Sequence, residues 1–247
     1  MDNFSKYHSE YNSDSSIGFF PGGFKPPHNG HFAALQSMLG LDVMNPETGK
    51  PILLGDSRPS NYVYVIIGHA PRGSQDQNKN YTTAKQRKTT SPDELSAMSE
   101  TMITKEMSMS VWDFYIEQSD QSLRDKTNIT ISPHASPIIG MEQAILNLKP
   151  REIANSQINL YAGAEDQSRY EYFTSDKFRM KISQEKQIKP ESIHIKRNML
   201  DRLGSATDVR SQILRVATQE ADIETLKTLL PPGVDISQFL ELVKTFR

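Results

Sequence analysis

The feature that most constrains the fold is a regular alternation of short β-rich runs with helical patterns. Runs of β-branched and aromatic residues are followed by stretches in which apolar residues recur every three or four positions. The expected strands are residues 17–20, 62–68, 128–132, 158–162 and 192–196, and the expected helices include 31–39, 138–148 and 166–178. This alternation predicts an α/β fold: a Rossmann-like, doubly wound parallel sheet with right-handed crossovers and helices on both faces.

The chain is expected to form one main domain, residues 17–220, because 247 residues suit a single α/β unit of this kind. Residues 1–16 are polar and lack periodicity, which predicts a flexible N-terminal leader. Residues 41–60 contain three prolines and two glycines, which indicates an insertion. Residues 221–247 carry two helical patterns around a Leu-Pro-Pro-Gly turn and predict a small helical C-terminal cap.

Composition excludes several classes of function. The net charge of −2 gives no global positive field for nucleic acid or an anionic membrane. The absence of cysteine excludes disulfides, thiolate catalysis and cysteine-bound zinc. No apolar stretch approaches the roughly 18 residues of a membrane span, and the N-terminus lacks the apolar core of a secretory signal. A cytoplasmic location is therefore expected, and the oligomeric state, including a homo-oligomer, is left open.

The first expected strand leads into a glycine turn and two histidines. Residues 18–31 read Gly-Phe-Phe-Pro-Gly-Gly-Phe-Lys-Pro-Pro-His-Asn-Gly-His. We expect Gly22 and Gly23 to adopt the dihedrals of a tight turn and to let the backbone approach a polyphosphate. The helix that follows would direct free N–H groups and its positive end at that anion. His28 and His31 would then stand beside it.

Two segments together carry a family resemblance. Gly-Phe-Lys-Pro-Pro-His-Asn-Gly-His, residues 23–31, resembles the His-x-Gly-His signature of the nucleotidylyltransferase superfamily, which has a cytidylyltransferase-like fold. Leu-Gly-Ser-Ala-Thr-Asp-Val-Arg, residues 203–210, resembles that superfamily's Ile-Ser-Ser-Thr-x-x-Arg segment, which opens a late helix and grips the nucleotide's phosphates. Both motifs follow expected strands, which puts them at the carboxyl edge of the sheet, where ligands of such folds bind.

The match departs from the family pattern at three positions. Gly23 stands where many relatives have a basic residue, and Lys25 stands where an acidic or amide side chain is common. Ala206 replaces a frequent serine. The identity of the substrate is therefore not inherited from the resemblance.

The resemblance implies an enzyme, a nucleotidyltransferase that transfers a nucleoside monophosphate to a small phosphorylated acceptor and releases pyrophosphate. The implied catalytic residues are His28, His31, Lys25 and Arg210. The implied nucleotide-binding residues are Gly22, Gly23, Phe24, Gly30, Ser205, Thr207, Asp208 and Asp166. No protein nucleophile is needed, because the catalyst has to hold two anionic partners in line and stabilise the charge of the transition state.

Several candidates have a second interpretation. Asp166 is a nucleotide contact or a helix N-cap. His69, directly after an expected strand, contacts the acceptor or hydrogen-bonds locally. The basic residues Lys85, Arg87 and Lys88 bind the acceptor or form a solvated loop. The two motif histidines would need further ligands to bind zinc, and none has suitable spacing, so no metal held by the protein is expected. Mg²⁺ is expected with the nucleoside triphosphate.

Three functions stay open at this level. ATP is favoured as the nucleotide, because the late motif looks more like the ATP-using version, and a cytidylyltransferase using CTP is the alternative. A non-catalytic nucleotide-binding protein of the same fold is the second alternative. A redox Rossmann enzyme is disfavoured, because the first turn lacks Gly-x-Gly-x-x-Gly. Nicotinamide mononucleotide, phosphopantetheine, a sugar or polyol phosphate and flavin mononucleotide all stay open as acceptors.

Overall fold

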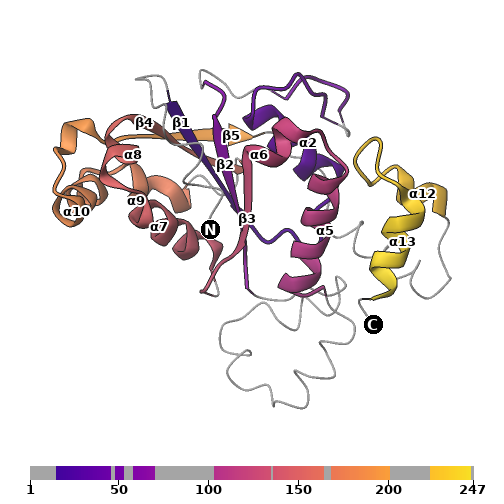
Figure 1. Ribbon diagram of the computed structural model, residues 1–247. Helices are drawn as coiled ribbons and strands as arrows, with labels where there is room; N and C mark the ends of the chain where they lie inside the picture. Colours follow the sequence, from indigo (N-terminus) through magenta and orange to yellow (C-terminus); the bar gives the residue numbers. More distant parts are fainter. Residues whose placement is uncertain are drawn as a thin grey trace, which may run out of the picture.

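The fold is built on five parallel strands (Figure 1). A computed structural model describes residues 15–45, 48–52, 58–69, 103–134, 136–163, 168–200 and 223–245. The strands are β1 (Ser15–Gly22), β2 (Tyr62–Ile67), β3 (Thr127–Ile131), β4 (Ser156–Gly163) and β5 (His194–Leu200). Their order in the sheet is β3-β2-β1-β4-β5, and every neighbouring pair is parallel. The predicted parallel α/β sheet is confirmed.

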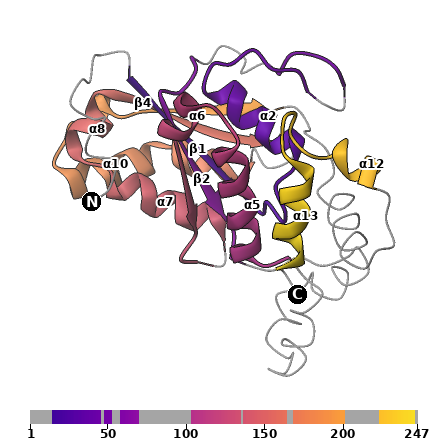
Figure 2. The ribbon, with the colours of Figure 1, turned by 45° about the vertical axis from the view of Figure 1, so that its right-hand side comes forward.

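Helices cover both faces of the sheet (Figure 2). One face carries α2 (Asn29–Met38), α5 (Lys105–Glu117), α6 (Gln121–Asp125), α12 (Ile223–Lys227) and α13 (Ile236–Lys244), whose apolar residues share one core. The other face carries α7 (Pro137–Asn147), α8 (Pro150–Ala154), α9 (Glu171–Thr174) and α10 (Asp176–Lys186), followed by the short 3-10 helix η3 (Pro190–Ser192). The sheet is therefore doubly wound, as the sequence predicted.

Alternation along β1 explains the two cores. Ile17 and Phe19 point into the core beneath α7, whereas Phe20 belongs to the core beneath α2 and α5. A strand buried on both faces reads as a continuous apolar run, because neither face meets water. This is why the sequence identified β1 and β2 without a polar alternation.

The topology has a switch point between β1 and β4. The chain passes from β1 through α2 to β2 on one side, whereas β4 pairs with the opposite edge of β1, and its crossover helices lie on the other face. Crevices at such a point, outside the carboxyl ends of the strands, are where open α/β sheets bind ligands. The turn after β1 opens onto this edge.

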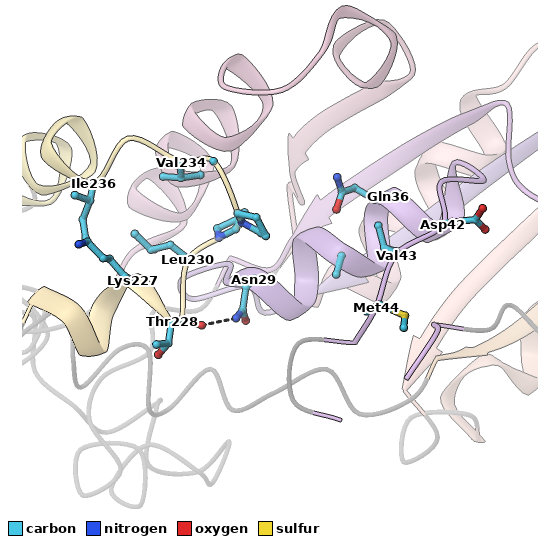
Figure 3. A pocket seen from close by; sticks show the side chains of 14 residues that line it. Asn29, Gln36, Asp42, Val43, Met44, Lys227, Thr228, Leu230, Val234 and Ile236 are labelled. Carbon is cyan, nitrogen blue, oxygen red and sulfur yellow. Dashed lines mark hydrogen bonds between the residues drawn. The ribbon is translucent and has the colours of Figure 1, made fainter. Parts of the chain in front are cut away.

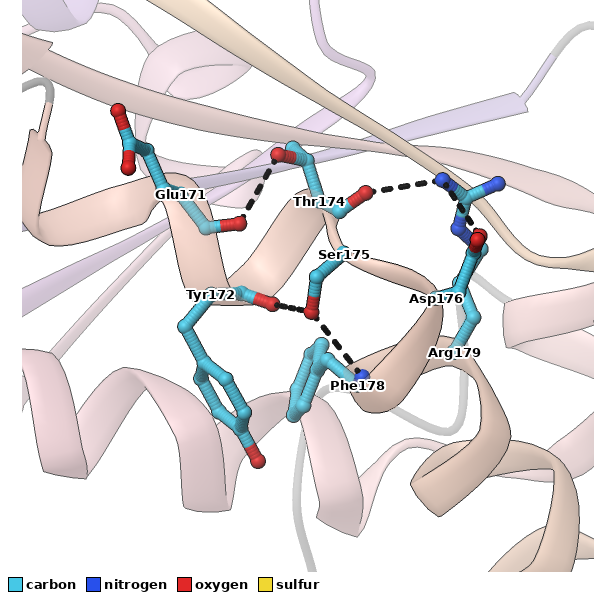
Figure 4. A network of polar contacts seen from close by, with 7 residues as sticks. All are labelled: Glu171, Tyr172, Thr174, Ser175, Asp176, Phe178 and Arg179. Carbon is cyan, nitrogen blue, oxygen red and sulfur yellow. Dashed lines mark hydrogen bonds and ion pairs between the residues drawn. The ribbon is translucent and has the colours of Figure 1, made fainter.

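The predicted helix 166–178 is helical in part but is not continuous, and its first two residues lie outside the described residues. Residues 168–170 form a 3-10 turn, α9 ends at Thr174, and α10 starts afresh at Asp176. Ser175 causes the break, because its hydroxyl donates to the Tyr172 carbonyl at 2.6 Å and accepts from the Phe178 N–H at 3.4 Å (Figure 4). Serine is a preferred N-cap, and its hydroxyl competes with the continuing helix.

Two other predicted boundaries shift, and the predicted insertion contains one β-bridge. The last expected strand begins at His194 and not at 192, since Pro190–Ser192 form a 3-10 turn. β1 starts at Ser15, so the last two residues of the predicted leader pair with β4, and residues 1–14 lie outside the described part of the chain. In the predicted insertion, Met44 and Pro51 form an antiparallel bridge.

The C-terminal cap is present as two helices, α12 and α13, joined through the Leu-Pro-Pro-Gly turn. Both helices contribute to the core that contains α2 and α5. None of the helices in the described ranges has the length and apolarity that a membrane crossing requires.

Candidate active site

The turn after β1 is shaped by Phe24. This residue has φ 42°, whereas neither Gly22 nor Gly23 has a positive φ, so the expectation that these glycines supply the unusual dihedrals is wrong. A Cβ on Gly22 would lie 2.6–2.9 Å from the Phe24 ring, and this close approach explains the glycine there. A Cβ on Gly23 would meet no atom of the described residues within 4 Å.

The Phe24 ring is held in an aromatic cluster. It packs edge-on against Phe20, His31 and Trp112, with ring centroids 4.8, 5.0 and 5.5 Å away. Such edge-to-face contacts stabilise an arrangement beyond the area that it buries. The left-handed backbone of Phe24 is thus offset by packing that also fixes one side of the His31 ring.

His28 is the N-cap of α2. Its backbone is extended (φ −140°, ψ 178°), its side chain is 1 % exposed, and its Nδ1 accepts the Gly30 N–H at 3.1 Å. A neutral imidazole whose Nδ1 accepts carries its hydrogen on Nε2. His28 is therefore oriented as an Nε2–H donor by the backbone of its own motif.

His31 lies in the first turn of α2, and its ring centroid is 3.8 Å from that of His28. Its Nδ1 is buried and has no hydrogen-bond partner among the described residues. Burial lowers the pKa of His31 well below its ordinary value of 6.5, and the neighbouring His28 lowers it further. In the ligand-free protein, His31 is a neutral imidazole at pH 7.

The start of α2 offers fewer free N–H groups than the sequence led us to expect. The Asn29 N–H donates to the Leu229 carbonyl at 3.0 Å. The Gly30 N–H is shared between His28 Nδ1 and Asn29 Oδ1, the latter at 2.7 Å. The first two backbone donors of the helix are therefore occupied within the protein.

Lys25 is buried in the turn. Its ammonium donates to the Gly68 carbonyl just beyond β2, and the Gly68 N–H donates to the Gly22 carbonyl at 2.8 Å. These bonds tie the carboxyl ends of β1 and β2 together. The contact of Lys25 with substrate oxygens stays a prediction.

His69 follows the same strand and is exposed. Its Nε2 accepts from the ammonium of Lys105, at the start of α5, as the local hydrogen-bond interpretation expects. The described structure thus gives His69 a local partner, and its contact with an acceptor stays a prediction.

The remaining candidates lie outside the described residues: Lys85, Arg87, Lys88, Asp166, Ser205, Thr207, Asp208 and Arg210. They belong to the segments that follow β2, β4 and β5 in the chain. Those three strands end at the same edge of the sheet as β1, because all are parallel. Their predicted roles stay predictions.

Sequence analysis missed two contributors to the site. Asn29 is the variable position of His-x-Gly-His, and its partners are about two hundred positions away. Tyr115 on α5 donates its hydroxyl to the Pro27 carbonyl at 3.3 Å, directly before His28. The two residues are 88 positions apart, so no local sequence pattern signals this contact.

Comparisons with known proteins give matches to solved structures only, at low identity. No protein-family model matches the chain, and no curated protein sequence matches it. Among solved structures, it is similar to Plasmodium falciparum nicotinic acid mononucleotide adenylyltransferase complexed with NaAD, at 11 % identity and a TM-score of 0.47 over 94 % of this chain and 96 % of that one. The same enzyme complexed with APC gives 11 % identity and a TM-score of 0.46 over 93 % and 98 %. With TM-scores below 0.5, the class of fold rests on the strand order and crossovers described above.

Proposed function

We propose that this chain is a nucleotidylyltransferase that transfers AMP from ATP to a small phosphorylated acceptor and releases pyrophosphate. One observation carries the proposal: two histidine rings lie with their centroids 3.8 Å apart and tilted by 39° at the start of the helix that follows the central strand, at the switch point of the sheet. The His-x-Gly-His resemblance of the same residues gives the pair its chemistry. Either feature alone would be weaker support.

In this mechanism an acceptor oxygen attacks the α-phosphorus of the triphosphate, and the bond from that phosphorus to the bridging oxygen of pyrophosphate breaks. The Nε2–H of His28 donates to a phosphate oxygen. His31, in the first turn of α2, contacts the same phosphates. Preorganised donors of this kind stabilise charge that develops in the transition state without reorganising. No covalent intermediate is required, because the two substrates react directly.

The neutral state of His31 suits a site that waits for an anion. Two imidazolium rings with centroids 3.8 Å apart would repel each other in the empty site, and burial adds to the penalty. A bound phosphate supplies the opposite charge and favours protonation. We therefore infer that His31 takes up its proton as the triphosphate binds.

The second motif completes the proposed site. We assign Ser205, Thr207 and Arg210, with the backbone around Asp208, to the β- and γ-phosphates, because a guanidinium and clustered N–H groups bind such oxygens well. Mg²⁺ enters as part of the nucleotide complex, since magnesium keeps much of its water and binds substrate phosphates readily. Within the described ranges, His, Asp and Glu side chains do not gather in threes, as a resident metal site would need.

A pyrophosphate-release screen tests the proposal. ATP and CTP are each combined with Mg²⁺ and with nicotinate mononucleotide, nicotinamide mononucleotide, phosphopantetheine, flavin mononucleotide, or a sugar or polyol phosphate. We expect release with ATP and one acceptor, and none from a His28→Ala, His31→Ala double variant. Release with CTP alone would move the protein to the cytidylyltransferases. Tight triphosphate binding without release from any pair would support the non-catalytic alternative.

A further inference from the structure

Asn29 connects the histidine motif to the C-terminal segment of the chain. Its backbone N–H donates to the Leu229 carbonyl at 3.0 Å, and its Nδ2 donates to the Thr228 carbonyl at 2.7 Å (Figure 3). Its Oδ1 accepts the Gly30 N–H at 2.7 Å. The amide thus has a fixed direction, with nitrogen toward the C-terminal segment and oxygen toward the start of α2.

The C-terminal segment, residues 226–243, is itself anchored. Leu226, Phe239 and Val243 are buried in the core that contains α2 and α5. The ring of Phe239 stacks on that of Tyr115 with centroids 6.2 Å apart. Since Tyr115 also donates to the Pro27 carbonyl, one packed unit holds the residues on both sides of His28.

Beyond Asn29 the C-terminal segment stands away from α2. A cavity of about 670 Å³ separates Ala33 and Gln36 on the helix from Pro232 and Val234 on the segment (Figure 3). Asn29 lines the same cavity where the two walls meet. The two Asn29 hydrogen bonds are therefore where the segment grips the beginning of the helix.

The Gly30 N–H connects Asn29 to His28. Its nitrogen lies 3.1 Å from His28 Nδ1 and 2.7 Å from Asn29 Oδ1, and both atoms accept its hydrogen. A rotation of the Asn29 amide would displace the donor that fixes the orientation and tautomer of the His28 ring. We propose that Asn29, held by Thr228 and Leu229, is a positioning residue that sets the His28 ring for phosphoryl contact. Its catalytic consequence rests on the function proposed above.

Two substitutions separate the long-range bond from the local one. Asn29→Ser keeps a short oxygen that accepts the Gly30 N–H but does not reach Thr228, whereas Asn29→Ala loses both interactions. We expect both variants to lower kcat about 10- to 100-fold while KM for ATP changes by less than about twofold, because a small misplacement of a reacting group costs this much. Glu241→Gln, on the exposed side of α13, is the matched control and should keep wild-type values.

A second readout does not depend on turnover. Nitrogen-15 NMR of labelled histidines in the ligand-free protein should show His28 with its hydrogen on Nε2 in the wild type and in Glu241→Gln. Both Asn29 variants should show a mixture of tautomers. Wild-type spectra in Asn29→Ala would overturn the proposal. So would wild-type spectra and kcat in Asn29→Ser, because an oxygen that accepts the Gly30 N–H would then position His28 without the bond to Thr228. If the wild type turns over no substrate, the proposed function fails, and the spectra still decide whether Asn29 positions His28.

Discussion

Two clusters of buried polar side chains lie on the same sheet and differ in how their atoms are used. In the first cluster, at the entry to β2, the Tyr161 hydroxyl and the Ser60 hydroxyl are 2.9 Å apart, and the Asn159 amide donates to Ser60 at 3.1 Å. At the carboxyl edge, His31 has a buried Nδ1 without a hydrogen-bond partner among the described residues. The first cluster is closed on itself, and the second is not.

This difference in hydrogen bonding suggests that the Tyr161 cluster is structural and agrees with the ligand-binding role proposed for the histidines. Burial raises the pKa of Tyr161 to about 12, so its hydroxyl stays protonated and serves as a fixed link between β4 and the entry to β2. Burial lowers the pKa of His31 and so favours its neutral form. A bound anion would favour the protonated form instead. A buried polar atom without a partner lowers stability, and such groups cluster at functional sites. The open hydrogen-bonding position of His31 agrees with the site proposed above.

The largest effect should come from removing either histidine. His28→Ala and His31→Ala are each expected to lower turnover about 100- to 1000-fold, the usual consequence of losing one transition-state donor. Thermal unfolding should show both variants folded, with His28→Ala less stable by about 1 kcal/mol because His28 is the N-cap of α2. Steady-state pyrophosphate release together with melting curves tests this. Wild-type rates in both folded variants would remove the histidines from catalysis.

Glycines in the two regions should respond differently to added methyl groups. A Cβ on Gly18 would meet Ser60 Oγ, Tyr161 Cε2 and Val63 Cγ2 at 2.8–3.0 Å, and overpacking of this kind costs about 1–3 kcal/mol. Gly18→Ala should therefore lose stability, as denaturant unfolding would show.

At the carboxyl edge the corresponding tests are Gly22→Ala and Gly23→Ala. Gly22→Ala should displace the Phe24 ring from His31 and lower turnover. The methyl group of Gly23→Ala would meet no atom of the described part of the chain within 4 Å, so stability should hold while ATP binding weakens if the phosphates pass there. Calorimetric binding of ATP distinguishes the two variants. Unweakened binding in Gly23→Ala would take that glycine out of the nucleotide site.

The sequence predicted the sheet well because β1 and β2 are buried on both faces and read as apolar runs with glycine or proline nearby. It did not predict the left-handed Phe24, because that backbone depends on rings contributed by Phe20, His31 and Trp112. A contact between aromatic groups on a strand, a turn and two helices leaves no local pattern.

The site was predicted in part for the same reason. His28 and His31 stand in a local motif, and the closeness of their rings follows from their spacing at a helix start. Asn29 and Thr228 are 199 positions apart, so no periodicity connects them. The break at Ser175 did have a local signal, an N-cap residue followed by an acidic first turn, which the helical pattern concealed.

A smaller effect is expected from opening the closed cluster. Tyr161→Phe removes the hydroxyl that pairs with Ser60 and should lower the free energy of unfolding by about 1–2 kcal/mol, the usual loss for one buried hydrogen bond. Turnover should not change, because the Tyr161 hydroxyl pairs with Ser60 before the amino end of β2, whereas the histidines follow the carboxyl end of β1. Chemical denaturation and steady-state kinetics measured on the same preparation test both halves. A tenfold fall in kcat at wild-type stability would contradict the separation of the two clusters.

The smallest effect is a pH dependence contributed by His31. Its folded-state pKa lies below the unfolded value of about 6.5, so as pH falls through that value the unfolded chain binds the proton first. Stability present at pH 7 is then lost, by at most about 1.4 kcal/mol per pH unit, and His31→Gln should flatten this part of the curve between pH 7 and 5. Tyr161→Phe is the control, because a hydroxyl with a pKa of about 12 does not titrate in this range, and its effect on stability should stay constant.

ATP binding should shift the pKa of His31 in the opposite direction, upward. A bound phosphate stabilises the imidazolium, so binding near pH 6 should take up a proton, seen as a calorimetric enthalpy that varies with the ionisation enthalpy of the buffer. His31→Gln should lose that uptake. An equal uptake in wild type and His31→Gln would show that another group titrates, and His31 would then serve the site as a neutral donor throughout.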